Sequence, residues 1–284
     1  MPEAPELDAA AALLRDHAAG RVIERVDLAS FSVLKTAEPP LSALAGKRIT
    51  EVGRRGKFLL IGCEDLHLAV HLARAGWLRW HTTNPKTPVR PGRSPLALRV
   101  VLDDGASFDV TEAGTKKGVA AYVTADPESL PEIATLGPEA GGLSVEDLAA
   151  ILAGSSSRLK TVLTQQSVMA GLGNGFSDDI LHAARLSPYA TARTLDAEEV
   201  TRLHAAIAEV LGRAAAALAG QRLDRIKDVK HAGYRVHART GLPCPVCGTD
   251  IAEVSFAEKS LQYCPSCQTG GRRLSDRRMD RLLK

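Results

Sequence analysis

The chain has 284 residues, of which 45% are hydrophobic, and its 36 Lys and Arg against 33 Asp and Glu leave a formal charge of only +3. This length and apolar content provide for two ordinary hydrophobic cores, and no apolar run is long enough to span a membrane. The N-terminus has no cleavable signal pattern, so we expect a soluble cytoplasmic protein that makes no membrane contact.

The first 140 residues predict one helix followed by short strands. The helix is expected at residues 5–17, with a proline in its first turn and two acidic residues near its positive end. Apolar residues then recur in eight short runs separated by turn residues, including Asp-Asp-Gly at residues 103–105, which is typical of a hairpin. The expected strands span residues 22–27, 48–52, 57–62, 67–72, 77–80, 97–102, 107–111 and 119–123. This pattern predicts an antiparallel β domain, a sandwich or a barrel, over residues 1–135.

The N-terminus offers a nucleophile. If the initiator Met1 is removed, the terminal amine becomes the secondary amine of Pro2. Because an α-amino group has a pKa near 8, roughly a tenth of it is neutral at pH 7, far more than for an ordinary lysine. Such an amine can attack an electrophilic sugar carbon and form an iminium intermediate, while Glu3 beside it could move protons. The alternative is that Met-Pro-Glu is an ordinary start without a chemical role.

Beyond a proline-rich join at residues 127–138 the pattern becomes helical. We expect helices at residues 144–152, 157–169, 177–184 and 197–218, in a second domain over residues 140–233. Gly-Leu-Gly-Asn-Gly at residues 171–175 interrupts two of these helices. This loop is either a plain connection or a phosphate site, in which backbone N–H groups and the side chain of Asn174 face an anion at the start of the helix carrying Asp178 and Asp179.

Four of the five cysteines stand near the C-terminus as two Cys-x2-Cys pairs separated by 16 residues. Two such pairs can close around one tetrahedral Zn²⁺ through their thiolates, with Gly248 free to take a positive φ after the second ligand. The expected ligands are Cys244, Cys247, Cys264 and Cys267. Residues 251–263 indicate two short strands around a turn, so we predict a zinc-bound β-hairpin over residues 234–270. A disulfide is the alternative, and the remaining Cys63 is expected to be a buried free thiol.

Positive charge is concentrated around this cysteine module. Residues 225–284 hold 12 Lys or Arg against six Asp or Glu, a balance of +6, so residues 1–224 sum to −3. A basic surface of this kind is typical of a protein that binds a phosphate backbone. The tail at residues 271–284 is its densest part. This tail is either a solvated amphipathic helix, capped by Ser275 and with Met279, Leu282 and Leu283 on one side, or a DNA contact.

Taken together, four separated motifs resemble one family over essentially the whole chain. They are Met-Pro-Glu-Ala-Pro-Glu at residues 1–6, Arg-Arg-Gly-Lys-Phe-Leu-Leu at 54–60, the run Leu-Lys-Thr-x-Leu-x-x-Gln-x-x-x-Ala-Gly-x-Gly-Asn at 159–174, and Tyr-Cys-Pro-x-Cys-Gln at 263–268. Their order is similar to that in the formamidopyrimidine-DNA glycosylase and endonuclease VIII family of bifunctional base-excision enzymes. The third motif matches the family's helix–two-turns–helix element, and the fourth matches its zinc finger.

The resemblance implies a role for particular residues. Pro2 would be the nucleophile at C1′ of the damaged nucleotide, Glu3 its acid/base partner, and Lys57 a phosphate contact that donates a proton during strand cleavage. His71 and Asn174 would hold phosphates around a nucleotide that has left the base stack. Further DNA contacts would come from Lys160 of the helix–two-turns–helix element and from Arg74 and His237, which replace residues that are usual in the family.

Those replacements concern the reading of the lesion. Arg74 stands where the family usually has a methionine that fills the void left by the flipped base, and residues 111–118 contain no aromatic residue. Lys259 takes the place of the finger arginine linked to the second elimination, which keeps the charge but loses the bidentate fork. His237 stands where a phosphate-binding tyrosine is usual. Residues 220–233, which should include the loop that covers an oxidised purine, look short and charged.

The sequence therefore predicts an α+β protein of several domains: a β-sandwich of about eight strands with flanking helices, then a helix–two-turns–helix domain and a zinc-bound β-hairpin. The expected function is that of a DNA glycosylase with β-lyase activity on oxidised or otherwise damaged bases in duplex DNA. We expect a monomer with one structural Zn²⁺, associated with the nucleoid of a prokaryote-like cell. Two alternatives are a damaged-DNA binding protein without glycosylase activity and a lyase that works mainly on abasic sites.

Overall fold

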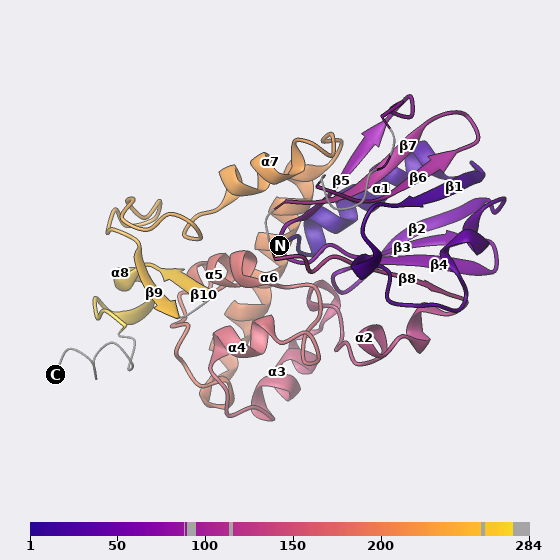
Figure 1. Cartoon of the computed structure of the whole chain (residues 1–284). Coiled ribbons are helices and arrows are strands. Elements are labelled where there is room, and N and C mark those ends of the chain that lie inside the picture. The colour runs from indigo at the N-terminus through magenta and orange to yellow at the C-terminus, as the bar shows by residue number, and fades with distance from the viewer. Residues whose placement is uncertain (88, 90–94, 114–115, 257–258, 275–284) are drawn as a thin grey trace. The chain divides into compact units, whose positions relative to one another are not determined.

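The computed structural model describes residues 1–284 apart from 88, 90–94, 114–115, 257–258 and 275–284 (Figure 1). The chain divides into two compact units. The β unit comprises Met1–Thr135 and Leu218–Lys227, and the helical unit comprises Leu136–Ala217 and Asp228–Lys284. The expected tail helix with Ser275, Met279, Leu282 and Leu283 lies outside the described residues.

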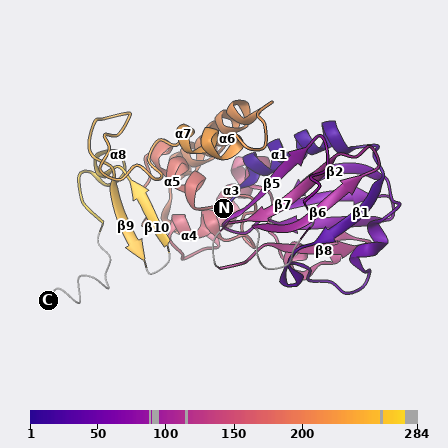
Figure 2. The ribbon, with the colours of Figure 1, turned by 45° about the horizontal axis from the view of Figure 1, so that its top comes forward.

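The β unit is a sandwich of two four-stranded antiparallel sheets, one of the two architectures that the eight short apolar runs predict (Figures 1 and 2). One sheet has the order β1-β6-β7-β5 and the other the order β2-β3-β4-β8. The strands are β1 Ile23–Leu28, β2 Ile49–Arg55, β3 Phe58–Cys63, β4 Leu66–His71, β5 Gly76–His81, β6 Leu96–Leu102, β7 Ser107–Glu112 and β8 Ala120–Thr124. All eight expected strands are present, and the sandwich, not the barrel, is formed.

Apolar side chains from both sheets fill the space between them. The largest fully buried ones in this unit include Leu59, Ile61, Leu68, Leu98 and Phe108. Helix α1 (Ala4–Ala18) packs on β2 and β3 through its apolar face. Cys63 at the end of β3 is fully buried and free, as predicted, and burial raises the pKa of its thiol to about 12.

The helical unit is built around one apolar core. Its main helices are α3 Val145–Ala153, α4 Leu159–Thr164, α5 Asn174–Ala183 and α6 Ala197–Leu218, with the short α2 Pro131–Ala134 before them in the β unit. Helix α3 begins as predicted because Ser144 and Asp147 form a capping box: the Ser144 hydroxyl accepts from the Asp147 N–H at 3.0 Å, and the Asp147 carboxylate accepts from the Ser144 N–H at 3.2 Å.

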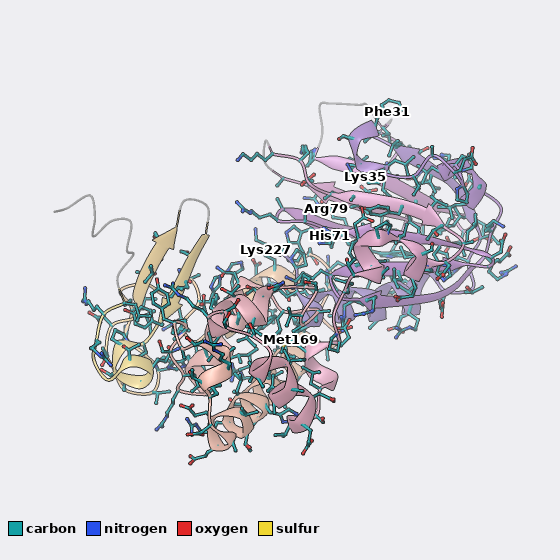
Figure 3. The ribbon with its side chains drawn as sticks, turned by 90° about the horizontal axis from the view of Figure 1, so that it is seen from below. Phe31, Lys35, His71, Arg79, Met169 and Lys227 are labelled. Atoms are coloured by element: carbon teal, nitrogen blue, oxygen red, sulfur yellow. The ribbon has the colours of Figure 1, made fainter. Side chains whose placement is uncertain are left out.

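Helix α4 is shorter than predicted, since it ends at Thr164 and not at residue 169. The side-chain amide of Gln166 donates to the carbonyls of Thr164 at 3.0 Å and Leu172 at 2.7 Å, and it accepts from the N–H of Gly171 at 3.1 Å. The Gln166 side chain thus hydrogen-bonds to backbone groups on both sides of the turn that follows α4, and these bonds stabilise the turn. Met169 lies in that turn, fully buried (Figure 3).

The cysteine module contains the predicted hairpin, β9 Ala252–Phe256 paired with β10 Lys259–Tyr263, followed by helix α8 Pro265–Thr269. Helix α7 (Ile226–Gly233) was not predicted, because this segment was interpreted as a charged loop. The ammonium of Lys230 in α7 lies 5.1 Å from the ring centre of Phe176 and 5.8 Å from that of Tyr234, so this cation packs on aromatic rings.

Within the described residues, the structure contains no helix with both the length and the apolar character needed to cross a membrane.

Candidate active site and nucleic-acid interface

Pro2 and Glu3 are held at a fixed position at the start of helix α1. Both are buried, and Glu3 is only 3% exposed, whereas Met1 is 47% exposed. Glu3 is the N-cap of the helix, and its backbone N–H donates to the carboxylate of Glu6 at 3.3 Å in a capping box. This arrangement satisfies N–H groups that a helix start leaves unpaired, so the first residues are anchored. An amine at Pro2 would therefore have a defined position.

A small apolar pocket lies beside Pro2. Its wall is formed by α1, by the start of β5 and by the segment that follows α6, and its volume is about 10 Å³. The residues that close it include Leu7, Trp77, Leu223 and Ile226. Leu223 and Ile226 belong to the stretch 220–233 that the sequence identified as the candidate covering loop, and they present apolar side chains to this pocket. The pocket has room for about one water molecule.

Lys57 and His71 lie at the same end of two neighbouring strands, β3 and β4, of one sheet. Lys57 is in the turn before β3 and is 5% exposed, and His71 ends β4, where its ring centre lies 4.9 Å from that of Phe58 (Figure 3). Burial lowers the pKa of His71, and the positive charge of Lys57 lowers it further. The lowered pKa favours the neutral form of His71, beside the positive charge of Lys57.

Arg74 lies in the turn between β4 and β5. Its neighbour Ala73 has a φ of 49°, and the N–H of Gly76 closes the turn by donating to the carbonyl of Leu72 at 2.8 Å. Arg74 is exposed and makes no hydrogen bond or ion pair with any described residue. Its guanidinium is thus available to a ligand. Residues 111–118 are the other segment expected to fill the void left by a flipped base, and residues 114 and 115 of this segment are not among the described residues.

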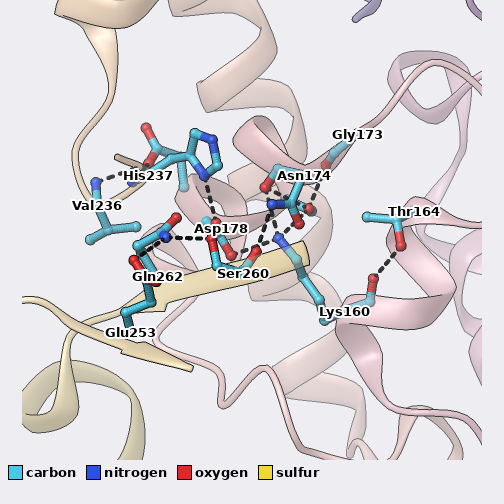
Figure 4. Close-up of polar contacts among 12 residues, drawn as sticks. Lys160, Thr164, Gly173, Asn174, Asp178, Val236, His237, Glu253, Ser260 and Gln262 are labelled. Atoms are coloured by element: carbon cyan, nitrogen blue, oxygen red, sulfur yellow. Dashed lines mark hydrogen bonds and ion pairs between the residues drawn. The ribbon is translucent and has the colours of Figure 1, made fainter. Parts of the chain in front are cut away.

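In the helical unit, Lys160 is directed inward. Its Nζ donates to the carbonyl of Asn174 at 2.7 Å, to the hydroxyl of Ser177 at 2.8 Å and to the carboxylate of Asp178 at 2.6 Å (Figure 4). An ammonium has three hydrogens, and these three acceptors match them. The sequence placed Lys160 among the expected DNA contacts, and in this structure the side chain holds the first turn of α5.

Two adjacent buried carboxylates of α5 fix the segment that leads into the cysteine module. Asp178 accepts from Lys160 and lies 2.8 Å from Nδ1 of His237 (Figure 4). Asp179 accepts from the backbone N–H groups of Arg235, Val236 and His237 at 2.8, 3.0 and 3.2 Å. Burial raises the pKa of Asp179, and the three N–H donors oppose that rise. His237 is therefore oriented by its side chain and its backbone together.

Asn174 begins α5 and faces the hairpin. Its Nδ2 donates to the carbonyl of Ser260 in β10 at 2.6 Å (Figure 4). The glycine after it is required by packing, because a Cβ on Gly175 would lie 2.0 Å from the hydroxyl oxygen of Tyr234. The 171–175 loop thus connects two helices and also brings Asn174 against the hairpin. Whether it binds an anion stays a prediction.

Asn174 lines a groove of about 200 Å³. Two other residues of this groove, Arg158 and Tyr189, were not predicted from the sequence. The guanidinium of Arg158 lies 3.7 Å from the ring centre of Tyr189, and both residues line the groove with Lys160 and Thr164. Arg158 and Tyr189 are 31 positions apart in the chain, so no spacing rule could have paired them. An arginine on an aromatic ring beside an amide can bind a phosphate or stack with a base.

The four C-terminal cysteines form one cluster with the geometry of a zinc site. Their sulfur atoms all lie within 4.8 Å of one another, and Sγ of Cys247 is 3.3 Å from that of Cys264 while Sγ of Cys244 is 3.9 Å from that of Cys267. Zn–S bonds of about 2.3 Å at tetrahedral angles place sulfur atoms about 3.8 Å apart. None of the four is in a disulfide, and Gly248 has a φ of 75°, as expected after the second ligand. The cluster fits one structural Zn²⁺.

The sequence-predicted residues fall into two groups. Pro2, Glu3, Lys57, His71 and Arg74 belong to the β unit. Lys160, Asn174, His237, Lys259 and the four cysteines belong to the helical unit. Lys259 begins β10, paired with Phe256, and its side chain lies outside the described part.

Three family models match successive parts of the chain. The formamidopyrimidine-DNA glycosylase N-terminal domain matches residues 1–113, the formamidopyrimidine-DNA glycosylase H2TH domain matches residues 136–223, and a zinc finger found in FPG and IleRS matches residues 241–270. These matches follow the order of the sandwich, the helices and the cysteine module.

Individual proteins show the same likeness. A Mycobacterium tuberculosis protein named as an uncharacterized formamidopyrimidine-DNA glycosylase-like protein is 56% identical over 154 residues, which cover 54% of this chain and 98% of that protein. A formamidopyrimidine-DNA glycosylase of Symbiobacterium thermophilum is 33% identical over 280 residues, 94% of this chain and 89% of that protein. The crystal structure of the MutM (Fpg) protein from Thermus thermophilus has a TM-score of 0.79 at 28% identity, covering 96% of this chain and all of that one.

Proposed function

Because the chain belongs to the formamidopyrimidine-DNA glycosylase family, we propose that it removes damaged bases from duplex DNA and cleaves the resulting abasic site through the amine of Pro2. The observation that carries the proposal is the anchored, buried position of Pro2: it borders an apolar pocket, and the capping box at Glu3 and Glu6 fixes its place. A nucleophile held in one position gains the advantage of an intramolecular reaction.

In this proposal Met1 is removed and the neutral amine of Pro2 attacks C1′ of the damaged nucleotide. The bond from C1′ to the base breaks, and the base leaves with a proton. Opening of the sugar gives an iminium ion on the Pro2 nitrogen, and loss of a proton from C2′ then expels the 3′ phosphate. Glu3 is the group assigned to move these protons, since it directly follows the amine in the chain and is buried.

The other residues would hold the DNA. Lys57 is assigned to a phosphate contact and to proton donation during strand cleavage, and neutral His71 beside it would donate a hydrogen bond to a phosphate. In the helical unit, Asn174 and His237 are assigned to the phosphate backbone, with Lys160 holding the turn at Asn174, and Lys259 is assigned to the second elimination. The +6 balance of residues 225–284 supports this assignment, because most of a protein's affinity for duplex DNA comes from neutralised phosphates. We expect the protein to act as a monomer.

One observation favours a second candidate, a lyase that works mainly on abasic sites. The pocket beside Pro2 has a volume of about 10 Å³, and the apolar side chains of Leu223 and Ile226 form part of its wall. A purine needs far more space than one water molecule occupies. An abasic site has no base to accommodate, so it could react without any movement of this wall.

Duplexes with a single modified nucleotide separate these functions. Wild-type protein would be incubated with duplexes that contain 8-oxoguanine, a ring-opened purine, an oxidised pyrimidine or an abasic site, and base release and strand cleavage would be measured separately. The glycosylase proposal predicts base release from at least one lesion and covalent trapping by borohydride on every cleaved duplex. Cleavage of abasic DNA without base release from any lesion would favour the lyase, and binding without trapping would contradict both. Glu3→Gln should slow base release more than cleavage of a preformed abasic site.

A further inference from the structure

His182 lies in α5 with its ring against the cysteine cluster. The side chain is 2% exposed, and its Nε2 lies 3.2 Å from Sγ of Cys244. The other ring nitrogen, Nδ1, is buried and has no hydrogen-bond partner among the described residues. A buried histidine with one unpaired nitrogen is costly, because that nitrogen has lost water and gained nothing. Among the described residues, the ring therefore makes one directed polar contact, and that contact is with a predicted zinc ligand.

The charge of the cluster explains what this contact does. Four thiolates around one Zn²⁺ leave a net charge of −2, and Cys244 and Cys264 are 3% and 0% exposed. Buried thiolates need N–H donors in place of water. The backbone N–H of Val246 lies 3.4 Å from Sγ of Cys244, and that of Cys267 lies 3.5 Å from Sγ of Cys264. Among the described residues, His182 contributes the only side-chain N–H that reaches a sulfur of the cluster.

Helix α5 connects this contact with the candidate DNA-binding residues. Asn174, Asp179 and His182 follow one another at intervals of five and three residues, which places them at successive turns of one helix. Asn174 donates to the carbonyl of Ser260, Asp179 accepts from the backbone of residues 235–237, and His182 contacts Cys244. Helix α5 therefore contacts the segment 235–263 and the cysteine cluster through three side chains, and the last of these contacts is with a cysteine of the cluster.

We propose that His182 is an outer residue of the zinc site, whose Nε2–H stabilises the Cys244 thiolate and joins the C-terminal end of α5 to the metal. A thiolate can only accept, so the hydrogen must be on Nε2 and the bare Nδ1 is the consequence. His182 acts through Cys244 and is a positioning residue, and the role assigned to it does not depend on the proposed enzymatic activity.

The test measures zinc affinity and not catalysis. Full-length zinc-loaded protein would be titrated with a chromogenic chelator, and His182→Phe, which keeps a buried ring without a donor, should bind zinc about 10- to 100-fold more weakly than wild type. His182→Gln supplies an amide N–H and should recover part of the affinity. His204→Phe is the matched control, because His204 also donates through Nε2, at 2.8 Å to the carbonyl of Leu143, but contacts no cysteine. This control should keep wild-type zinc affinity.

Cobalt substitution supplies a spectroscopic readout. In Co²⁺-loaded His182→Phe, the sulfur-to-metal charge-transfer band should shift while its intensity stays that of four thiolates, and amide exchange in residues 174–183 should be faster. Zinc affinity and charge-transfer bands in His182→Phe equal to those of His204→Phe would overturn the proposal. A loss of intensity equal to one thiolate would also overturn it, because it would mean that the substitution had removed a cysteine from the metal.

Discussion

Removal of the Asp178 carboxylate should destabilise the helical unit strongly. The side chain is fully buried, and it pairs at 2.6 Å with the ammonium of Lys160, which is 11% exposed, and at 2.8 Å with the ring of His237. Loss of one partner of a buried ion pair typically costs about 3–5 kcal/mol, since the other charge stays buried and unpaired. In Asp178→Ala, Lys160 would keep two neutral acceptors, on Asn174 and Ser177. We therefore expect Asp178→Ala to lower the free energy of unfolding by about 3 kcal/mol, near the lower limit of this range.

Urea unfolding can resolve this loss, because the two units have different reporters. Both tryptophans of the chain, Trp77 and Trp80, lie in β5, so their fluorescence follows the β unit. Far-UV circular dichroism follows mainly the helices. Asp178→Ala should lower the midpoint seen by circular dichroism more than the midpoint seen by fluorescence.

An exposed ion pair provides the control. Glu198 bonds Arg202 at 2.9 Å on the surface of α6, with 83% and 41% of the two side chains exposed. Glu198→Ala should cost only about 0.3–0.5 kcal/mol. If Asp178→Ala costs no more than Glu198→Ala, the reasoning about the buried network is refuted. The double variant Lys160→Met/Asp178→Leu should recover part of the stability, because it leaves no unpaired charge.

Four further outcomes are expected. Arg74→Ala should change the preference for the base opposite the lesion by about 1–3 kcal/mol, measured as relative cleavage rates on duplexes that differ only in that base. Unchanged ratios of these rates would exclude a role of Arg74 in recognising the opposite base. Leu223→Ala should enlarge the pocket beside Pro2 and increase base release relative to abasic cleavage, and a fall in that ratio would contradict a blocking wall. The pKa of His71 is lower in the folded chain than the ordinary 6.5, so the unfolded chain binds the proton more tightly and the free energy of unfolding should fall as pH drops below about 6.5. His71→Phe should make the free energy of unfolding, measured by fluorescence in urea titrations, depend less on pH. An unchanged pH dependence in this variant would mean that other groups cause it. Cys247→Ser or zinc removal should weaken duplex binding, measured by anisotropy at several salt concentrations, and undiminished affinity would contradict a structural zinc.

The strands could be predicted from the sequence because their signals are local. Each is a short apolar run that lies between turn residues, and the hairpin between β6 and β7 uses Gly105 with a φ of 82°. The end of α4 could not be predicted, since it depends on the amide of Gln166 bonding across the turn to Leu172. Helix α7 was missed because few of its residues are apolar, and it is supported from outside by Lys230 over the rings of Phe176 and Tyr234.

The residues of the candidate site also differ in how far the sequence predicts them. The cysteine cluster follows from spacing alone, and all four residues meet. By contrast, the partners of the α5 side chains are far away in the chain: Asp179 accepts from Arg235, and His182 contacts Cys244. A pair of adjacent acids at residues 178 and 179 is typical of a solvated surface, and only the fold shows that both are buried. The inward direction of Lys160 likewise depends on partners that the fold brings together.

We expect the amine of Pro2 to form the covalent bond with DNA. Protein would be incubated with an abasic duplex, reduced with borohydride and digested, and the modified peptide would be sequenced by mass spectrometry. A chain with an uncleaved residue ahead of Pro2 is the matched control, since it keeps every side chain and removes only this amine. We predict that the sugar fragment is attached to the nitrogen of Pro2 in wild type and that the control gives no adduct. Attachment to Lys57 or another lysine, or an undiminished adduct in the control, would contradict the account.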